Sequence, residues 1–188
     1  MRFRTQVKIL EKAEALLDER GIEVQPVALK FLVPWFGGAS IEDEGDECMA
    51  RRWATLLANA AAGEGGNEVL PSYAAILSEL TSREAELVEW LYRPYVDKGL
   101  QSPKRDGRGV EEILHSMGLA GDLPAFIVVA ENAMRLGLCD RAWRSEGANL
   151  GGAGADMHHA YERLLPTQFG LAFVRACTVP PLASTSTS

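Results

Sequence analysis

The sequence lacks the features that mark secreted, zinc-binding and membrane-spanning proteins. It has three cysteines, Cys48, Cys139 and Cys177, with no C-x-x-C pair, which predicts reduced thiols and a cytoplasmic protein. Its most apolar run, VALKFLVPWF at residues 27–36, is much shorter than the about 20 residues that a membrane span needs. The N-terminus has no apolar signal-peptide core. We therefore expect no membrane association.

Positive charge is also scarce. The chain carries 19 basic and 26 acidic side chains, a net charge of −7, whereas a general nucleic-acid coat shows a basic excess. No lysine follows Lys104, so the glycine-rich GGAG at residues 151–154 cannot be a phosphate loop, which ends in Gly-Lys-Ser/Thr. No G-x-S-x-G occurs, and the three histidines form no triad with a serine. We expect no enzyme, no cofactor and no bound metal.

What the sequence does contain is a succession of helical patterns. Hydrophobic residues make up 47% of the chain, enough for a packed core, and their spacing of three and four residues is helical. From residue 81 on, the predicted order is three helices, a strand at 138–144, a glycine-rich turn, a strand at 160–165 and a helix. This order is typical of a winged helix. We predict a mainly α protein: a helical N-terminal part, 1–80, packed on a winged-helix-like C-terminal part, 81–178, with a two-stranded β-wing, and a disordered tail, 179–188.

Capping residues predict where several helices begin and end. The apolar run at 27–36 is predicted to be a buried short helix that ends near Pro34. Ser40, with Asp43 three residues later, is the predicted cap of the next helix. Asp122 and Thr167 are the predicted caps of two later helices.

The densest charge in the chain is a cluster of acids before the predicted central helix. A hard cation could bind there and serve a metal-dependent enzyme, but the alternating oxygen ligands of a calcium loop are absent. Acids at a helix N-terminus are favoured by the helix dipole, which is the better explanation. Glu47 and Arg51 are also spaced for an i, i+4 ion pair. The acids are Glu42, Asp43, Glu44, Asp46 and Glu47.

Three residues of the predicted central helix are candidates for binding a partner. Arg51 and Arg52 follow the acids and could dock an acidic protein surface, or only neutralise their own helix. Asn59 lies beside a leucine stripe, so its amide must find a hydrogen-bond partner inside the protein or on another molecule.

Four residues of the predicted winged helix are candidates for nucleic-acid contact. Asn132 and Arg135 would point outward from the third helix, the one that reads bases in this fold. Arg141 and Arg144 would lie on the wing. Glu131 beside them would repel phosphate, and balanced charge gives little counterion release. DNA binding is therefore possible but not favoured.

Six stretches in order resemble the bacterial abortive-infection alpha family: FRTQVKILEKA, VALKFLVPWFGGASIED, WATLLANAAAG, NEVLPSYAAILSELTSREAEL, ENAMRLGL and GLAFVRAC. They span residues 3–177. The resemblance implies a role in antiviral defence, in which an infected cell is halted before phage can spread, and it implies no established reaction. Carried over by position, the family pattern points to Trp53, Leu56, Leu57 and Asn59 in the central helix, and to Gly170, Phe173 and Cys177 in the last.

The functional expectation combines the resemblance with the missing catalytic set. We predict a non-enzymatic module of phage defence that senses or binds a partner protein, or a second copy of itself, through the N-terminal acidic helix face or the wing. The alternative is a winged-helix transcription regulator that binds DNA.

Overall fold

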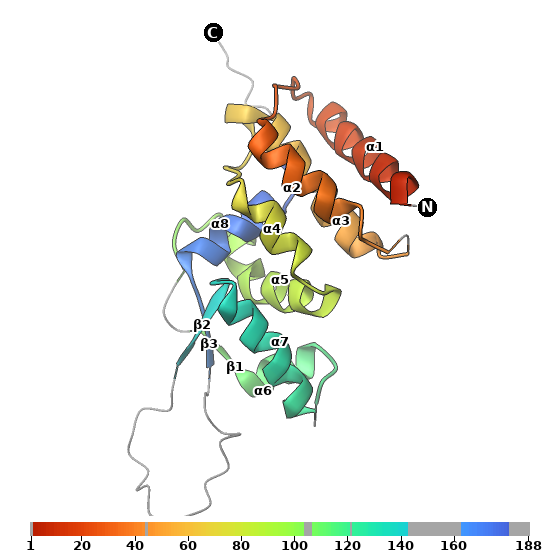
Figure 1. The fold of residues 1–188 in the computed structure, drawn as a ribbon. Helices are drawn as coiled ribbons and strands as arrows, with labels where there is room; N and C mark the ends of the chain where they lie inside the picture. The colour runs from red at the N-terminus through yellow and green to blue at the C-terminus, as the bar shows by residue number, and fades with distance from the viewer. Residues whose placement is uncertain (1, 44, 104–106, 121, 143–162, 181–188) are drawn as a thin grey trace, which may run out of the picture. The chain divides into compact units, whose positions relative to one another are not determined.

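The chain is mainly helical, with one small β-sheet (Figure 1). The computed structural model describes residues 2–43, 45–103, 107–120, 122–142 and 163–180. By its internal contacts the chain divides into two compact units, Met1–Ser82 with Ala172–Ser188, and Arg83–Leu171. The described residues 172–180 thus fall in the first of these units.

The first unit is built around one central helix. It contains α1 (Arg2–Arg20), α2 (Leu29–Ala39), α3 (Glu47–Ala61), the short 3-10 helix η1 (Gly63–Gly65), α4 (Ser72–Ser78) and the last residues of α8 (Gln168–Ala176). Helix α1 packs along α3, and α2 packs against α4. Residues 53–59 of α3 are all buried. Most of them are small or apolar, and the polar Thr55 and Asn59 form hydrogen bonds inside the unit.

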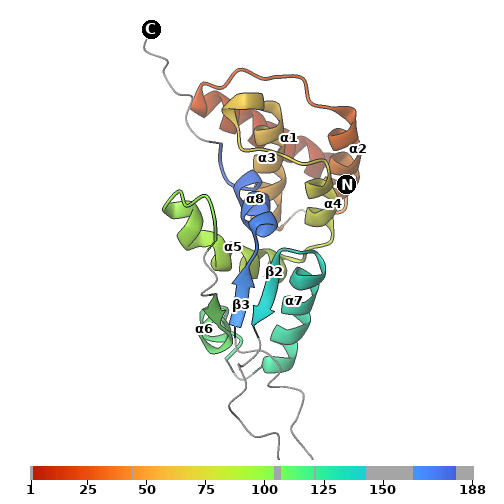
Figure 2. The same cartoon turned by 90° about the vertical axis from the view of Figure 1, so that its left-hand side faces the viewer.

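The second unit combines helices with the sheet. It contains α5 from Arg83 on (the helix spans Ser82–Asp97), β1 (Arg108–Gly109), α6 (Val110–Ser116), α7 (Leu123–Arg135), β2 (Cys139–Ala142), β3 (Arg163–Pro166) and the first residues of α8. The antiparallel strands are ordered β1-β3-β2. Figure 2 shows β2 and β3 side by side next to α7. The core is made by buried residues of the helices and of β2 and β3, among them Leu91, Ile113, Phe126 and Leu164.

The sheet corrects the prediction of a two-stranded wing. A third strand, β1, pairs with β3 through Arg108 and Gly109. Sequence patterns missed it because two residues inside a polar loop show no alternation. The predicted glycine-rich wing tip falls in residues 143–162 and so lies outside the described residues, as do residues 181–188 of the predicted disordered tail.

One tyrosine hydroxyl ties together three segments of the second unit. Tyr92 Oη donates to Leu138 O at 2.6 Å and accepts from Thr167 N, also at 2.6 Å. Thr167 caps α8, as predicted, since its Oγ1 accepts from Gly170 N at 2.9 Å while donating to Gly137 O at 2.8 Å. Burial raises the pKa of Tyr92, so the hydroxyl keeps its proton for this network.

Candidate functional site

Helix α2 presents an apolar face to solvent. Leu29, Val33 and Phe36, spaced i, i+4 and i+7, are 75%, 70% and 41% exposed. We call these three residues the apolar face of α2. Lys30 is the only charged residue on the helix. Among the described residues no helix is long and apolar enough to cross a membrane.

The apolar face of α2 corrects two predictions. The run at 27–36 was expected to be buried and to end near Pro34, but the helix continues to Ala39 with Pro34 inside it. Proline costs the helix one hydrogen bond, the one to the carbonyl of residue 30. The run is apolar apart from Lys30, a composition typical of a buried helix. This unit covers only the side that carries Phe31 and Trp35.

The buried side of α2 is fixed to α3 by two tryptophans. Trp35 Nε1 donates to Trp53 O at 3.1 Å, and the two rings meet edge to face with centroids 6.2 Å apart. Gly38 leaves room for the Trp53 ring, since a Cβ there would lie 2.7 Å from Trp53 Cζ2 and closer still to Cη2. These contacts hold α2 in one orientation, so its apolar face is presented by a rigid support.

The acidic stretch between α2 and α3 acts as a structural connector. Asp46 caps α3, its Oδ1 accepting from Met49 N at 2.9 Å, and its other oxygen accepts from the Ser82 hydroxyl. The hydrogen bond from Ser82 is the main cause that lowers the pKa of Asp46. The predicted cap at Ser40 with Asp43 is wrong. That cap would start a helix at Ile41, whereas α3 starts at Glu47. Ser40 Oγ instead donates to Gly37 O at the end of α2.

Glu42 links the acidic stretch between α2 and α3 to the side chain of Trp53. Its Oε1 accepts from Trp53 Nε1 at 2.7 Å. Partial burial raises the pKa of Glu42, although the hydrogen bond from Trp53 works in the opposite direction. In the described residues, no three metal-ligating side chains converge, here or elsewhere. Glu44 lies outside the described residues.

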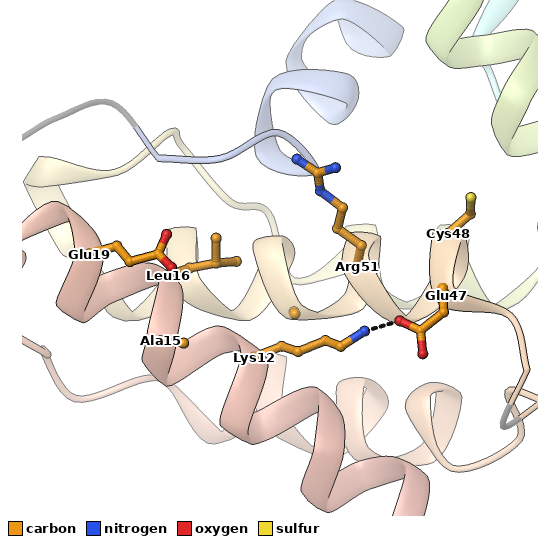
Figure 3. A pocket seen from close by; sticks show the side chains of 8 residues that line it. Lys12, Ala15, Leu16, Glu19, Glu47, Cys48 and Arg51 are labelled. Carbon is orange, nitrogen blue, oxygen red and sulfur yellow. Dashed lines mark hydrogen bonds and ion pairs between the residues drawn. The ribbon is translucent and has the colours of Figure 1, made fainter.

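Arg51 and its neighbours line an open groove between α1 and α3 (Figure 3). Glu47, expected to pair with Arg51, instead pairs with Lys12 of α1, and this bond lowers the pKa of Glu47. Arg51 is exposed and extends away from the Lys12–Glu47 pair. Of the three partner-binding candidates, Arg51 is therefore the one whose side chain is most open to solvent.

Arg52 is half-buried and lies close to the acidic cap and the C-terminal end of α8. Its charge helps to lower the pKa of Asp46 and opposes the effect of burial on Cys177. Burial nonetheless raises the pKa of Cys177 to about 12, and that of Cys139 also to about 12. Both thiols are protonated at neutral pH, so they are poor nucleophiles.

Asn59 uses its whole amide inside the first unit. The side chain is 1% exposed. Its Nδ2 lies 3.0 Å from Thr55 O, 2.9 Å from Ala176 O and 2.7 Å from Thr178 O. Its Oδ1 accepts from Asn67 N at 2.8 Å and from Asn67 Nδ2 at 3.1 Å. The hydrogen-bond partners that the sequence predicted for this amide therefore all lie within the chain. The amide is buried and is not exposed for contact with another molecule.

The nucleic-acid candidates are less available than the sequence predicted. Asn132 Nδ2 donates to the buried Glu84 at 2.7 Å, and Asn132 Oδ1 accepts from Arg135 Nε at 2.9 Å. Arg141 lies exposed on β2. Arg144 lies outside the described residues. Asn132 and Arg135 are therefore hydrogen-bonded to each other, and Asn132 is also hydrogen-bonded to the buried Glu84 of the same unit.

A family comparison matches almost the whole chain. A model of the family described as abortive infection alpha matches residues 4–177, a range that begins inside α1 and ends one residue after α8. No curated protein and no solved structure shows a significant match to the chain. Several residues in the stretches that resemble the family have structural roles here, among them Trp53, Asn59 and Gly170.

Proposed function

The chain belongs to the abortive infection alpha family, and from this premise we propose that it acts in bacterial antiphage defence as a non-enzymatic protein-interaction module. In such defence an infected cell stops before phage can spread. The observation that carries the proposal is the apolar face of α2. The sequence led us to expect the interaction surface on the acidic helix face or on the wing. We now propose that it lies on α2, a helix that the sequence predicted to be buried.

An exposed helix face of this kind suits protein recognition. Apolar anchors at i, i+4 and i+7 are the pattern by which one helix is recognised by a groove or another helix. Burying a Leu, Val or Phe side chain contributes about 1.5–3 kcal/mol when it is fully covered. The tryptophan contacts behind α2 reduce the ordering cost of binding, because the helix is already in place.

We propose in addition that the second unit is a winged helix used for protein contact. Support comes from its order of one helix, a short strand, two helices, two strands and a helix, and from the strand order β1-β3-β2. In that arrangement α7 would be the base-reading helix. Its Asn132 and Arg135 are already hydrogen-bonded within the unit, and Glu131 beside them is exposed, which disfavours the DNA-binding regulator.

The test compares two valines of similar exposure. Val33 on α2 is 70% exposed and Val128 on α7 is 68% exposed. We expect Val33→Glu to abolish phage protection in a plaque assay and Val128→Glu to leave it intact, with both variants folded by circular dichroism. Loss of protection in Val128→Glu alone, together with salt-dependent DNA binding by the wild type, would favour the regulator. Protection by both variants would remove the proposal.

A further inference from the structure

The open groove between α1 and α3 is a second surface, separate from the apolar face of α2. We propose that this groove binds a short acidic segment of a partner protein, with an apolar side chain of that segment against its apolar residues and a carboxylate against Arg51. The inference does not rest on the proposed function, because none of the groove residues belongs to α2. The size, the apolar lining and the charge of the groove support it.

The size of the groove suits a few residues of peptide. Its volume is about 440 Å³, within the roughly 300–1,000 Å³ that is typical of binding sites. On α1 the groove runs from Lys12 to Glu19, a length of about 10 Å at roughly 1.5 Å per residue. An extended chain rises about 3.3 Å per residue, so about three residues of a partner would lie along it.

The groove has a small and apolar lining at its centre. Ala15 and Leu16 come from α1 (Figure 3), and Ala54 comes from α3. The two alanines occupy little space, and Leu16 is only half-buried, so an apolar side chain can enter and be covered there. Helices α1 and α3 pack directly on each other, which means that the lining is in place before a partner binds.

One end of the groove already holds a carboxylate. Glu47 forms an ion pair there with Lys12. The hydrogen bond from Lys12 and, to a smaller degree, the charge of the exposed Lys8 lower the pKa of Glu47. Of the described acids from Glu42 to Glu47, only Glu47 lines the groove. Three cations, Lys8, Lys12 and Arg51, therefore lie around one carboxylate, which leaves this end positive in a chain with a net charge of −7.

Arg51 is the cation that is open to a carboxylate from outside. Its side chain is exposed and points away from the Lys12–Glu47 pair (Figure 3), and it forms no hydrogen bond or ion pair with the residues that the structure describes. A guanidinium can bind a carboxylate through two parallel N–H···O bonds. Glu19 lies at the opposite end of the groove and limits the positive region to this short length. That favours a short acidic segment over a nucleic acid, whose affinity depends on many phosphate contacts.

The test uses the exposed thiol of Cys48, which lines the groove. Burial raises the pKa of Cys139 and Cys177 to about 12, so iodoacetamide should react first at Cys48. The probe is a hexapeptide of alternating glutamate and leucine, blocked at both ends, and its control carries glutamine in place of glutamate. We expect about 1 mM glutamate peptide to slow the alkylation of Cys48 about threefold, and the glutamine peptide to leave it unchanged. Mass spectrometry of the full chain measures the rate.

Two pairs of variants locate the contact. Arg51→Glu should abolish the protection, whereas Arg83→Glu, the same charge change at an exposed arginine of α5, should keep it. Ala15→Trp should also abolish the protection by filling the groove, and Val33→Glu on α2 should keep it. Protection is the ratio of the rates with and without peptide in one variant, so a change in the intrinsic reactivity of Cys48 cancels. Circular dichroism checks that each variant is folded.

Several results would overturn the inference. If neither peptide slows alkylation in the wild type, the groove does not bind acidic segments. Equal slowing by both peptides would show that charge has no part. If a single-stranded DNA oligonucleotide protects Cys48 better than the glutamate peptide, and Arg51→Glu removes that protection, the groove binds nucleic acid. Self-association of the wild type that Arg51→Glu removes would assign the groove to a second copy of the chain.

Discussion

The two units hold opposite ends of the same helix by different chemistry. Residues 172–176 of α8 belong to the first unit, where the amide of Asn59 binds the backbone at the end of the helix. Residues 168–171 belong to the second unit, where the hydroxyl of Tyr92 binds the backbone before its start. Each unit thus closes its core with one buried polar side chain that contacts main-chain atoms far away in sequence.

The Asn59 amide and the Tyr92 hydroxyl differ in the number of backbone groups with which they form hydrogen bonds. An amide has two donor hydrogens and an acceptor oxygen, so the two hydrogens of Asn59 are shared among three carbonyls and its oxygen accepts from two N–H groups. A phenol has one hydrogen, so Tyr92 serves chiefly one carbonyl and one N–H group. A helix end needs several carbonyls satisfied at once, and the amide suits that task. Breaking the amide should therefore cost more than breaking the hydroxyl.

The largest effect is expected for Asn59→Ala. The substitution leaves the carbonyls of Ala176 and Thr178 and the N–H of Asn67 without their partner in a buried site, and each unsatisfied group costs about 1–3 kcal/mol. Some of that cost is relieved by water, so we expect the free energy of unfolding to fall by about 3–4 kcal/mol. Chemical denaturation measures it, and amide hydrogen exchange should show faster exchange at Asn67.

The matched control for Asn59→Ala is Asn67→Ala, which removes one side-chain bond and leaves the backbone bond of residue 67 to Asn59 Oδ1 in place. Its cost should be about 1 kcal/mol. If both variants lose equal stability, the carbonyls at the end of α8 do not depend on Asn59.

Gly170→Ala should produce the next largest effect, and it lies in the second unit. A Cβ at this position would lie 2.7 Å from Tyr92 Cζ and closer still to Leu138 O. Because a backbone carbonyl cannot rotate away, the helix must shift, at a cost of about 2–3 kcal/mol. Thermal unfolding measures the loss. Gly109→Ala is the control, since nothing lies within 4 Å of its Cβ position, and a comparable loss there would rule out the steric cause.

Tyr92→Phe keeps the ring and removes only the hydroxyl. We expect a loss of about 1–2 kcal/mol, because Leu138 O and Thr167 N lose one buried partner each. The distinguishing readout is faster hydrogen exchange of the Thr167 amide. Unchanged exchange at Thr167 would mean that the hydroxyl does not hold the start of α8. A loss larger than that of Asn59→Ala would reverse the comparison between the units.

The sequence predicted local features well and distant ones poorly. The caps at Asp122 and Thr167 are confirmed, because a cap depends on residues three positions apart. The partners of Asn59 could not be named, since Ala176 lies 117 positions away. The apolar face of α2 was missed for a related reason. Periodicity shows that a helix is apolar all round, but it does not show how many sides its neighbours cover.

The smallest effect is expected for Glu42, which accepts a hydrogen bond from Trp53 within the first unit. Burial raises the pKa of Glu42 in the folded state above its usual 4.5. The folded protein therefore takes up this proton before the unfolded chain does, so stability from this group increases as pH falls through the folded pKa toward 4.5. Asp46 works in the opposite direction. Its pKa is lowered from 3.8, so its contribution is present above 3.8 and lost as pH falls through its folded value.

Glu42→Gln isolates this effect, because glutamine can still accept from Trp53 Nε1 without carrying a buried charge. We expect the variant to be more stable than the wild type at pH 7 by about 0.5 kcal/mol or less, and the difference to shrink as pH falls toward 4.5. Denaturation monitored by tryptophan fluorescence at several pH values measures it. Asp46→Asn should instead be less stable at pH 7 and approach the wild type only below pH 3.8. A loss of stability in Glu42→Gln at pH 7 would contradict this prediction. It would mean that the charge of the Glu42 carboxylate, hydrogen-bonded to Trp53, stabilises the first unit in addition to the Asn59 amide.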